Sequence, residues 1–322
     1  MAQPNSSFTE LAAITIANYS KELSDNVSNN IPLLFYIDKK GNLKEDVSGG
    51  TTILENLDYG DNASFKWFSG YEELSVAPTD AFTAASFDWK ECNANVIFSQ
   101  REVAINSGEA KQFDLIKSKT LNTQRSIKNN LGAALYYSNT ESDGKAIGGL
   151  QHLVADDPTT GIVGGINRGT AGNEFWRNQL YDFSVETVTA SATTIQGAMA
   201  TLYKRCSRNA DVPDVIVLGD TYHSFWEASL QAQQQFHNTQ DAGSGFVTQR
   251  YKKAVVLYDP NCSATRGYFL NSDFLKFKSH ADVNMVVGEA RLPTNQMATV
   301  IPVNWMGNLT TSNASLQGVM HA

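Results

Sequence analysis

The chain has 322 residues, of which 42% are hydrophobic and 18% charged, a balance typical of a globular protein rather than a disordered one. Its formal net charge is -8 and its pI is about 5.2. Such an acidic chain is a poor candidate for broad nucleic-acid binding, because that binding depends on lysine and arginine. The length suits two modest domains, or one core domain with long excursions.

The cysteines and the apolar segments exclude further classes of protein. Cys92, Cys206 and Cys262 lie far apart without a CxxC pair, so neither a disulfide framework nor a zinc cage is indicated. The N-terminus lacks the basic start and apolar core of a signal peptide. No segment approaches the roughly 20 apolar residues of a membrane span. We therefore expect a soluble protein, made in a reducing cytoplasm, with no membrane partner.

In chain order, residues 1–30 are predicted to form an N-terminal arm, in which "TELAAITIANYSKEL" can make one short helix. The apolar run "IPLLFYID" is then predicted to be a strand that ends at the turn "KKGN". Stretches of alternating pattern follow over residues 51–98, on both sides of the turn signal "APTD". They predict a long two-stranded excursion from the fold.

The predicted excursion is rich in aromatic side chains, namely Phe65, Trp67, Phe68, Tyr71, Phe82, Phe87 and Trp89. An isolated hairpin is only marginally stable in water. A hairpin with this composition therefore needs another surface to rest on, which is the first indication of assembly in the sequence.

The longest helix is predicted over residues 110–138, where apolar residues recur every three or four positions without an internal proline. A helix of about 26 residues would be about 39 Å long. A Gly-rich connection over residues 145–180 follows. Helices then alternate with strands over residues 181–285, which indicates a compact α/β unit. The end of the chain is predicted to be a strand with Pro293 and Pro302 at its edges or ends.

The Gly-rich stretch "GIVGGINRGTAGNEFWRNQ", residues 161–179, has the composition of a phosphate-binding loop without its spacing. The sequence has neither GxxxxGK[ST] nor a GxGxxG between a strand and a helix. We interpret the glycines as allowing sharp turns in a passage between two domains. Trp176 with Arg177 could stack on a base or sugar, but in an acidic chain a tryptophan that anchors the loop or docks on a neighbour is favoured.

Enzyme chemistry does not emerge from the remaining motifs. The histidines, His152, His223, His237, His280 and His321, have no metal-ligand spacing. No GxSxG motif is present. The paired carboxylates in "ADDP" and "YEEL" are interpreted as solvated or turn-capping groups. We therefore predict a protein that is not an enzyme, with no catalytic residues, no cofactor and no metal.

The order of these pieces resembles the major capsid proteins of tailed bacteriophages, whose fold encapsulin shells and herpesvirus capsid floors share. The stretch from "FKWFSGYEEL" to "APTDAFTAASFDWKECNANVIFS" looks like the extended loop of that family. "REVAINSGEAKQFDLIKSKTLNTQRSIKNNL" looks like its spine helix. "GKAIGGLQHLVADDPTTGIVGGINRGTAGNEFWRNQ" is similar to its linker, and "PDVIVLGDTYHSFWEASLQ" to a strand and helix of its axial domain. The four motifs in this order cover nearly the whole chain.

The resemblance implies an α+β fold of the Hong Kong ninety-seven type. Its expected parts are an N-terminal arm over 1–30, a peripheral-domain strand over 31–50, an extended β-hairpin loop over 51–98, a peripheral domain with the long spine helix over 99–150, a linker and an α/β axial domain over 151–285, and a peripheral return strand with the C-terminus over 286–322. Since about thirty residues precede the first strong strand, we expect a separate scaffolding protein or none. Lys66 lies on the loop, but nothing identifies the asparagine or the acid of a crosslink, so none is predicted.

The function implied by the resemblance is that of a major capsid protein. It would form hexamers and pentamers of an icosahedral shell around double-stranded DNA, which it would enclose without sequence-specific binding. It would assemble in the host cytoplasm and reside in the virion, with scaffolding, portal and decoration proteins as further partners. An encapsulin-like nanocompartment shell is the alternative. Contacts between subunits are expected at Phe65, Lys66, Trp67, Phe68, Tyr71, Phe87, Trp89, Arg168, Trp176 and Arg177.

Overall fold

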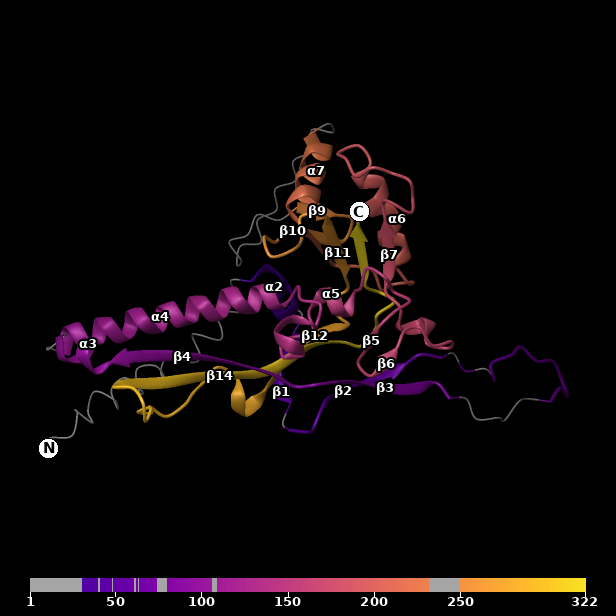
Figure 1. Cartoon of the computed structure of the whole chain (residues 1–322). Helices are drawn as coiled ribbons and strands as arrows, with labels where there is room; N and C mark the ends of the chain where they lie inside the picture. Colours follow the sequence, from indigo (N-terminus) through magenta and orange to yellow (C-terminus); the bar gives the residue numbers. More distant parts are fainter. Residues whose placement is uncertain are drawn as a thin grey trace.

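The computed structural model describes residues 31–39, 41–47, 49–60, 62, 64–73, 80–105, 109–231 and 249–322, with the backbone alone over 43–47, 103–105 and 109–117. The predicted N-terminal arm lies outside the described residues. The described chain forms an elongated lower layer and a more compact unit that stands on it (Figure 1). We call the lower layer the peripheral domain and the upper unit the axial domain.

The peripheral domain is built on a mixed five-stranded sheet. In spatial order its strands are β1 (Leu43–Val47), β12 (Leu275–His280), β14 (Ala298–Thr311) and β13 (Val286–Val287), and β4 (Lys90–Ser99) also pairs with β14. Strands β4 and β14 are antiparallel along the whole of β4, from Lys90 opposite Gly307 to Ser99 opposite Ala298. This long ribbon gives the domain its elongated shape (Figure 1).

One long helix, α4 (Glu109–Ala134), lies along β4 and β14 (Figure 1). The short helix α3 (Gln100–Ile105) connects β4 to it. Over the part with described side chains, the buried residues are spaced by three or four positions: Thr120, Thr123, Ile127, Leu131 and Ala134. One face of the helix therefore packs on the domain, as an amphipathic pattern requires. The long helix predicted over residues 110–138 is confirmed, although it ends at Ala134.

The prediction of a strand at "IPLLFYID" is wrong, because this run forms the helix α2 (Pro32–Lys39). Proline is well suited to the first turn of a helix, where its missing N–H is not needed. The first helical hydrogen bond runs from the Phe35 amide to the Ile31 carbonyl at 2.9 Å. Leu33, Leu34, Tyr36 and Ile37 are all buried, and a short run that is apolar on every side does not reveal its period.

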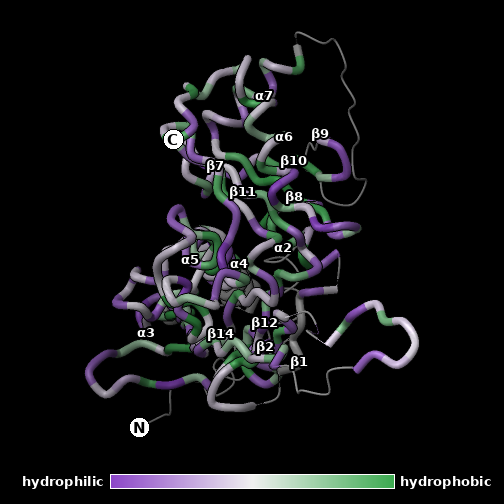
Figure 2. Tube along the Cα trace, turned by 90° about the vertical axis from the view of Figure 1, so that its right-hand side faces the viewer, coloured by the Kyte–Doolittle hydropathy of each residue, from purple (hydrophilic) through white to green (hydrophobic). Residues whose placement is uncertain are grey.

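The axial domain confirms the predicted α/β unit. Its six-stranded sheet has the order β7 (Gln179–Asp182), β15 (Gly318–His321), β11 (Arg266–Leu270), β8 (Val215–Leu218), β10 (Ala254–Tyr258), β9 (Gln249–Tyr251). Helices α6 (Ile195–Arg205) and α7 (Asp220–Gln231) pack on it. Strand β8 is buried along its whole length. Figure 2 shows hydrophobic segments gathered along these strands.

The domain boundaries differ from the expected ones at three strands. β4 belongs to the peripheral sheet and not to the extended loop, β12 belongs to the peripheral and not to the axial sheet, and β15 returns the C-terminus to the axial sheet. The alternating pattern of a strand shows which of its faces is buried. It does not show which sheet the strand joins, because pairing partners far away in the sequence decide that.

The remaining strands form two hairpins. β2 (Ile53–Asp58) pairs with β3 (Phe82–Phe87), and β5 (Ile162–Val163) pairs with β6 (Ile166–Asn167). Short helical turns occur at α5 (Leu150–Leu153), η1 (Glu141–Gly144), η2 (Glu174–Trp176) and η3 (Ala281–Val283). The segment between β2 and β3 projects away from the rest of the subunit (Figure 1). We call β2, β3 and the residues between them the extended loop.

Candidate assembly surface

The base of the extended loop is a regular antiparallel hairpin, with register running from Ile53 opposite Phe87 to Asp58 opposite Phe82. Every second residue of β2 is buried. The buried face of the hairpin comprises Ile53, Glu55, Leu57, Ala85 and Phe87. The base is therefore part of the folded subunit, as the period of two in its burial requires.

Two hydrogen bonds hold the ends of this base: one joins the two ends to each other, and the other joins them to β14 of the peripheral domain. The Trp89 indole nitrogen donates to the Gly50 carbonyl at 3.0 Å. The Asn308 side-chain amide donates to the Asp88 carbonyl at 2.8 Å. Trp89 also meets His280 edge to face, with ring centroids 5.5 Å apart. The chain is thus held both where it enters the loop and where it leaves it.

The tip of the loop has the opposite character. Phe65 is 74% exposed and Trp67 is 89% exposed, and Phe68 and Tyr71 are exposed as well. Phe65 and Trp67 meet edge to face at 5.7 Å, which leaves most of both rings in water. Large apolar groups that gather on an exposed surface mark an interaction site.

Of the residues expected at subunit contacts, one group lies at this tip: Phe65, Lys66, Trp67, Phe68 and Tyr71. Lys66 lies 3.6 Å from the Glu72 carboxylate, and both side chains are largely exposed. An exposed pair of this kind contributes little to stability. Phe87 is buried in the base within its own subunit, so its predicted intersubunit contact is wrong. Trp89 is half-buried at the base.

The Gly-rich stretch packs against the same base. Gly164 and Gly165 form the turn between β5 and β6 with φ of 57° and 76°. A Cβ at Gly164 would stand 2.8 Å from the Cβ of Ala85, and the Ser86 amide donates to the Gly164 carbonyl at 2.9 Å. Glycine is required here both for the backbone conformation and for the close approach. The interpretation of the glycines as turn residues is confirmed.

Arg168 and Trp176 hold this connection together from the inside. Arg168 is fully buried; its Nε donates to the Trp176 carbonyl at 3.1 Å and its Nη2 donates to the Leu153 carbonyl. Burial lowers the pKa of the Arg168 guanidinium to about 10. The Trp176 indole, also buried, donates to the Val163 carbonyl at 2.9 Å. The expected intersubunit contacts of these two side chains are wrong, because a neighbouring subunit cannot reach them.

Arg177 and Phe175 complete the connection. Arg177 is partly exposed, and its Nε donates to the Arg168 carbonyl at 3.0 Å, so it stays a candidate for subunit contact. Phe175 stacks on Tyr59, just beyond β2, with centroids 4.7 Å apart and planes 24° apart. The Gly-rich connection therefore braces the extended loop where it leaves the fold. Tyr59 was not among the residues predicted to make contacts, although an aromatic residue at the end of a strand is a visible signal in the sequence.

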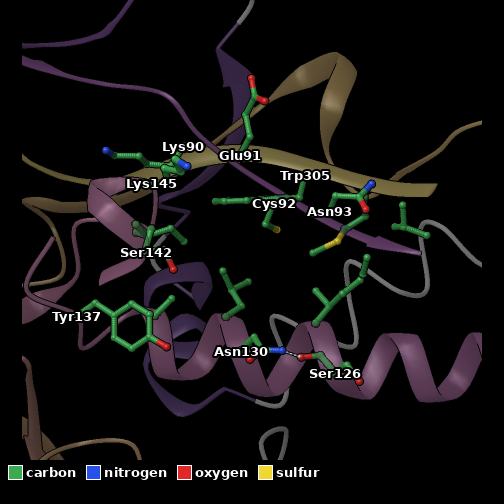
Figure 3. Close-up of a pocket in the computed structure, with 18 residues that line it drawn as sticks. Lys90, Glu91, Cys92, Asn93, Ser126, Asn130, Tyr137, Ser142, Lys145 and Trp305 are labelled. Atoms are coloured by element: carbon green, nitrogen blue, oxygen red, sulfur yellow. Dashed lines mark hydrogen bonds between the residues drawn. The ribbon is translucent and has the colours of Figure 1, made fainter. Parts of the chain in front are cut away.

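A cavity of about 310 Å³ lies between α4 and the β4–β14 ribbon (Figure 3). Figure 3 shows Ser126 and Asn130 on the helix wall, Trp305 on the opposite side, and Lys90 beside Lys145 at one end. Its apolar lining is Ala94, Ile127, Leu131, Ala134, Ala146, Ile147, Met285, Val303 and Trp305. This volume is at the lower end of ligand sites in proteins, and it can take an aromatic side chain.

Within the described ranges, no three histidine, cysteine or carboxylate side chains gather in a way that could hold a metal ion. None of the helices in this part of the chain combines the length and hydropathy needed to cross a membrane.

Solved structures that are similar to this chain share one fold, although sequence comparisons find no match. No protein-family model matches the chain, and no curated protein matches its sequence. The structure is similar to a capsid subunit of cyanophage A-1(L), with a TM-score of 0.57 and 14% identity over 88% of this chain and 92% of the other. It is also similar to the capsid of Myoviridae phage XM1, with a TM-score of 0.56 and 10% identity over 88% and 90%.

An encapsulin complex of Synechococcus elongatus is similar as well, with a TM-score of 0.54 and 10% identity over 88% of this chain and 86% of that chain. At such low identities the likeness shows the fold. The chain therefore has the α+β fold of the major capsid proteins of tailed bacteriophages, the Hong Kong ninety-seven type, and the predicted fold class is confirmed.

Proposed function

We propose that this chain is the major capsid protein of a tailed bacteriophage. It self-assembles into hexamers and pentamers of an icosahedral shell that encloses double-stranded DNA. The observation that supports this most directly is the extended loop, which combines a rigid base with an exposed aromatic tip. A fold that recurs in phage capsids supplies the context.

The direction of the loop favours a head-to-tail contact between subunits. The extended loop and α4, whose residues line the cavity, extend to opposite sides of the subunit (Figure 1), so the tip of one copy meets the cavity only in a second copy. Contacts between different surfaces of identical subunits generate rings when the rotation closes. Rings of five or six subunits are the units from which a closed shell is built.

The energy of such a contact is adequate. Burying an aromatic side chain contributes about 1.5–3 kcal/mol, and the tip carries Phe65, Trp67, Phe68 and Tyr71. Each contact can be weak, because closure of a ring and then of a shell multiplies the contacts. In the tip of a second copy, Glu72 and Glu73 follow these rings in sequence. Lys90 and Lys145 lie at one end of the cavity, whose lining contains a single acidic residue, Glu91. This charge complementarity favours the cavity as the receiving surface.

The proposal assigns a structural role, with no catalytic activity and no cofactor. It places the protein in the virion after assembly in the host cytoplasm, with scaffolding, portal and decoration proteins as further partners. The enclosed DNA is not bound sequence-specifically, and the net charge of -8 agrees with an inner wall that does not retain DNA during packaging.

Electron microscopy of the purified protein tests the proposal. We expect closed particles with rings of five and six subunits, formed by the chain alone or together with the other head proteins of its source. A chain that stays monomeric under both conditions and at high concentration contradicts the proposal. The encapsulin likeness supports one alternative, a nanocompartment shell. Native particles that contain nuclease-protected DNA favour the capsid, and particles that contain protein cargo favour the alternative.

A further inference from the structure

A buried carboxylate joins the extended loop to the peripheral sheet. Glu55 lies in the middle of β2 and is 4% exposed. Its Oε1 lies 2.6 Å from the Lys278 ammonium, and its Oε2 accepts a hydrogen bond from the Lys276 ammonium at 2.9 Å. The Thr310 hydroxyl donates to Oε1 at 2.8 Å. We call Glu55, Lys276, Lys278 and Thr310 the Glu55 cluster.

The Glu55 cluster links three strands that are far apart in the sequence. Lys276 and Lys278 lie on one face of β12, whose other face carries the buried Leu275 and Phe277. Thr310 stands opposite Lys276 in the register of β12 and β14. The cluster thus ties β2, in the extended loop, to the two strands on which the hairpin base rests.

An apolar residue at position 55 would be expected to stabilise the fold at least as well as the buried glutamate does. Ile53 and Leu57, two residues before and after Glu55, are buried on the same face of β2. Removing a carboxylate from water is costly, and replacing a buried ion pair by apolar residues of similar volume is often neutral or stabilising. Burial by itself raises the pKa of Glu55, and the hydrogen bonds from Lys278, Lys276 and Thr310 outweigh it, so the pKa lies below its usual value.

The charges of the Glu55 cluster restrict the orientation of β2 relative to the peripheral sheet. An apolar stripe packs nearly as well after a small rotation or slide. A carboxylate held by two ammonium groups and a hydroxyl has one narrow optimum, because charge-assisted hydrogen bonds depend on distance and angle. The Glu55 cluster sits between the fold and the projecting tip, so a small rotation at β2 becomes a large displacement of the tip.

We propose that the Glu55 cluster is a positioning device that sets the direction in which the extended loop leaves the subunit. Neutralising Glu55 leaves Lys276 and Lys278 facing each other without their shared carboxylate. The hairpin base then pivots about the contacts that remain, at Gly164 and at Asp88, while the subunit stays folded. The purpose of this device rests on the proposed function, since a loop that contacts a second copy must be aimed.

The test measures the direction of the loop in the isolated subunit. Spin labels are placed at Ser69→Cys in the tip and Asn129→Cys on the exposed side of α4, with Cys92→Ser to remove the exposed native thiol. Pulsed electron resonance then gives the distribution of distances between the labels in the full chain. In Glu55→Gln we expect a distribution about two-fold wider than in the unchanged cluster, or a shifted mean distance. Asp58→Asn, the same change on the exposed side of the same strand, should leave the distribution unchanged.

A second variant separates positioning from folding. Glu55→Leu with Lys276→Met and Lys278→Met replaces the charges by apolar groups of similar volume, so this variant should fold with an unchanged or higher melting temperature. We expect its distance distribution to widen in the same way. A distribution with the same width and the same mean distance as that of the original cluster, in either variant, overturns the proposal.

This experiment can contradict the positioning role of the Glu55 cluster without contradicting the proposed function, and the reverse also holds. The distance measurement uses subunits before assembly, so it does not require shells. If the original chain never forms shells, the proposed function fails while the positioning role can still hold. If shells form and the distances do not change, the positioning role fails alone. With both correct, Glu55→Gln should lower the yield of closed shells about ten-fold, because weak contacts multiply around each ring.

Discussion

The axial sheet and the tip of the extended loop use the same kinds of side chain in opposite ways. Trp226 in α7 is 2% exposed and meets Tyr251 edge to face at 5.3 Å. Trp67 at the tip is 89% exposed. The first contributes its apolar surface to the fold of its own subunit, whereas the second contributes only when another molecule covers it. Part of the apolar surface of the chain therefore stabilises the fold, and part of it is available for assembly. Substitutions in the axial domain and at the tip can test these two roles separately.

The largest effect is expected from removing the tip. The two sides of the loop already meet where the tip begins, because the Tyr59 amide donates to the Ala81 carbonyl at 3.0 Å. Deleting 61–79 and joining Gly60 to Asp80 therefore keeps β2 and β3 intact. We expect an unchanged fold by circular dichroism and a yield of closed shells that falls by about 100-fold or more, since every contact of every ring is lost. Normal shells from this deletion would show that the tip is not an assembly element.

A matched pair of tryptophan substitutions sharpens the comparison. Trp226→Ala should lower the free energy of unfolding by about 3–5 kcal/mol, because it leaves a cavity in a packed core. Trp67→Ala should change it by less than about 0.5 kcal/mol, as is usual for exposed positions, while raising the protein concentration needed for assembly. Urea unfolding of the unassembled subunit and light scattering during assembly measure the two effects. Equal losses of stability would mean that the tip packs on its own subunit.

Much of the fold follows from local patterns in the sequence. The spine helix is readable because its apolar positions recur along more than seven turns without a breaker, and the axial unit because β8 is a continuous apolar run between two helices. The error at Pro32–Lys39 has a local cause, since an apolar run of eight residues has no decisive period. β4, β12 and β15 each pair with at least one strand more than a hundred residues away, namely β14, β1 and β7, and no local pattern encodes these pairings.

The residues of the assembly surface likewise fall into those that a local pattern predicts and those that depend on distant parts of the chain. The exposed rings of the tip could be predicted, because nothing near them in sequence can cover so much apolar surface. Arg168 was expected at a subunit contact because it lies in the Gly-rich connection between the two domains. It is buried instead, and the Trp176 and Leu153 carbonyls of this irregular connection accept hydrogen bonds from its Nε and Nη2. Glu55 gave a signal that was missed, as an acidic residue that occupies the buried face of an alternating strand.

The smallest effect concerns the connection between the two regions, where acid should weaken the fold. Burial, together with the nearby cations Arg168 and Lys90, lowers the pKa of His152 from its usual 6.5 to about 4. The unfolded chain therefore takes up this proton first as the pH falls, so stability is lost between pH 6.5 and 4. We expect a loss of about 2 kcal/mol between pH 7 and pH 5 that His152→Gln largely removes. Urea midpoints at the two pH values measure it. An equal loss of stability in both proteins would mean that groups other than His152 set the response of the fold to acid.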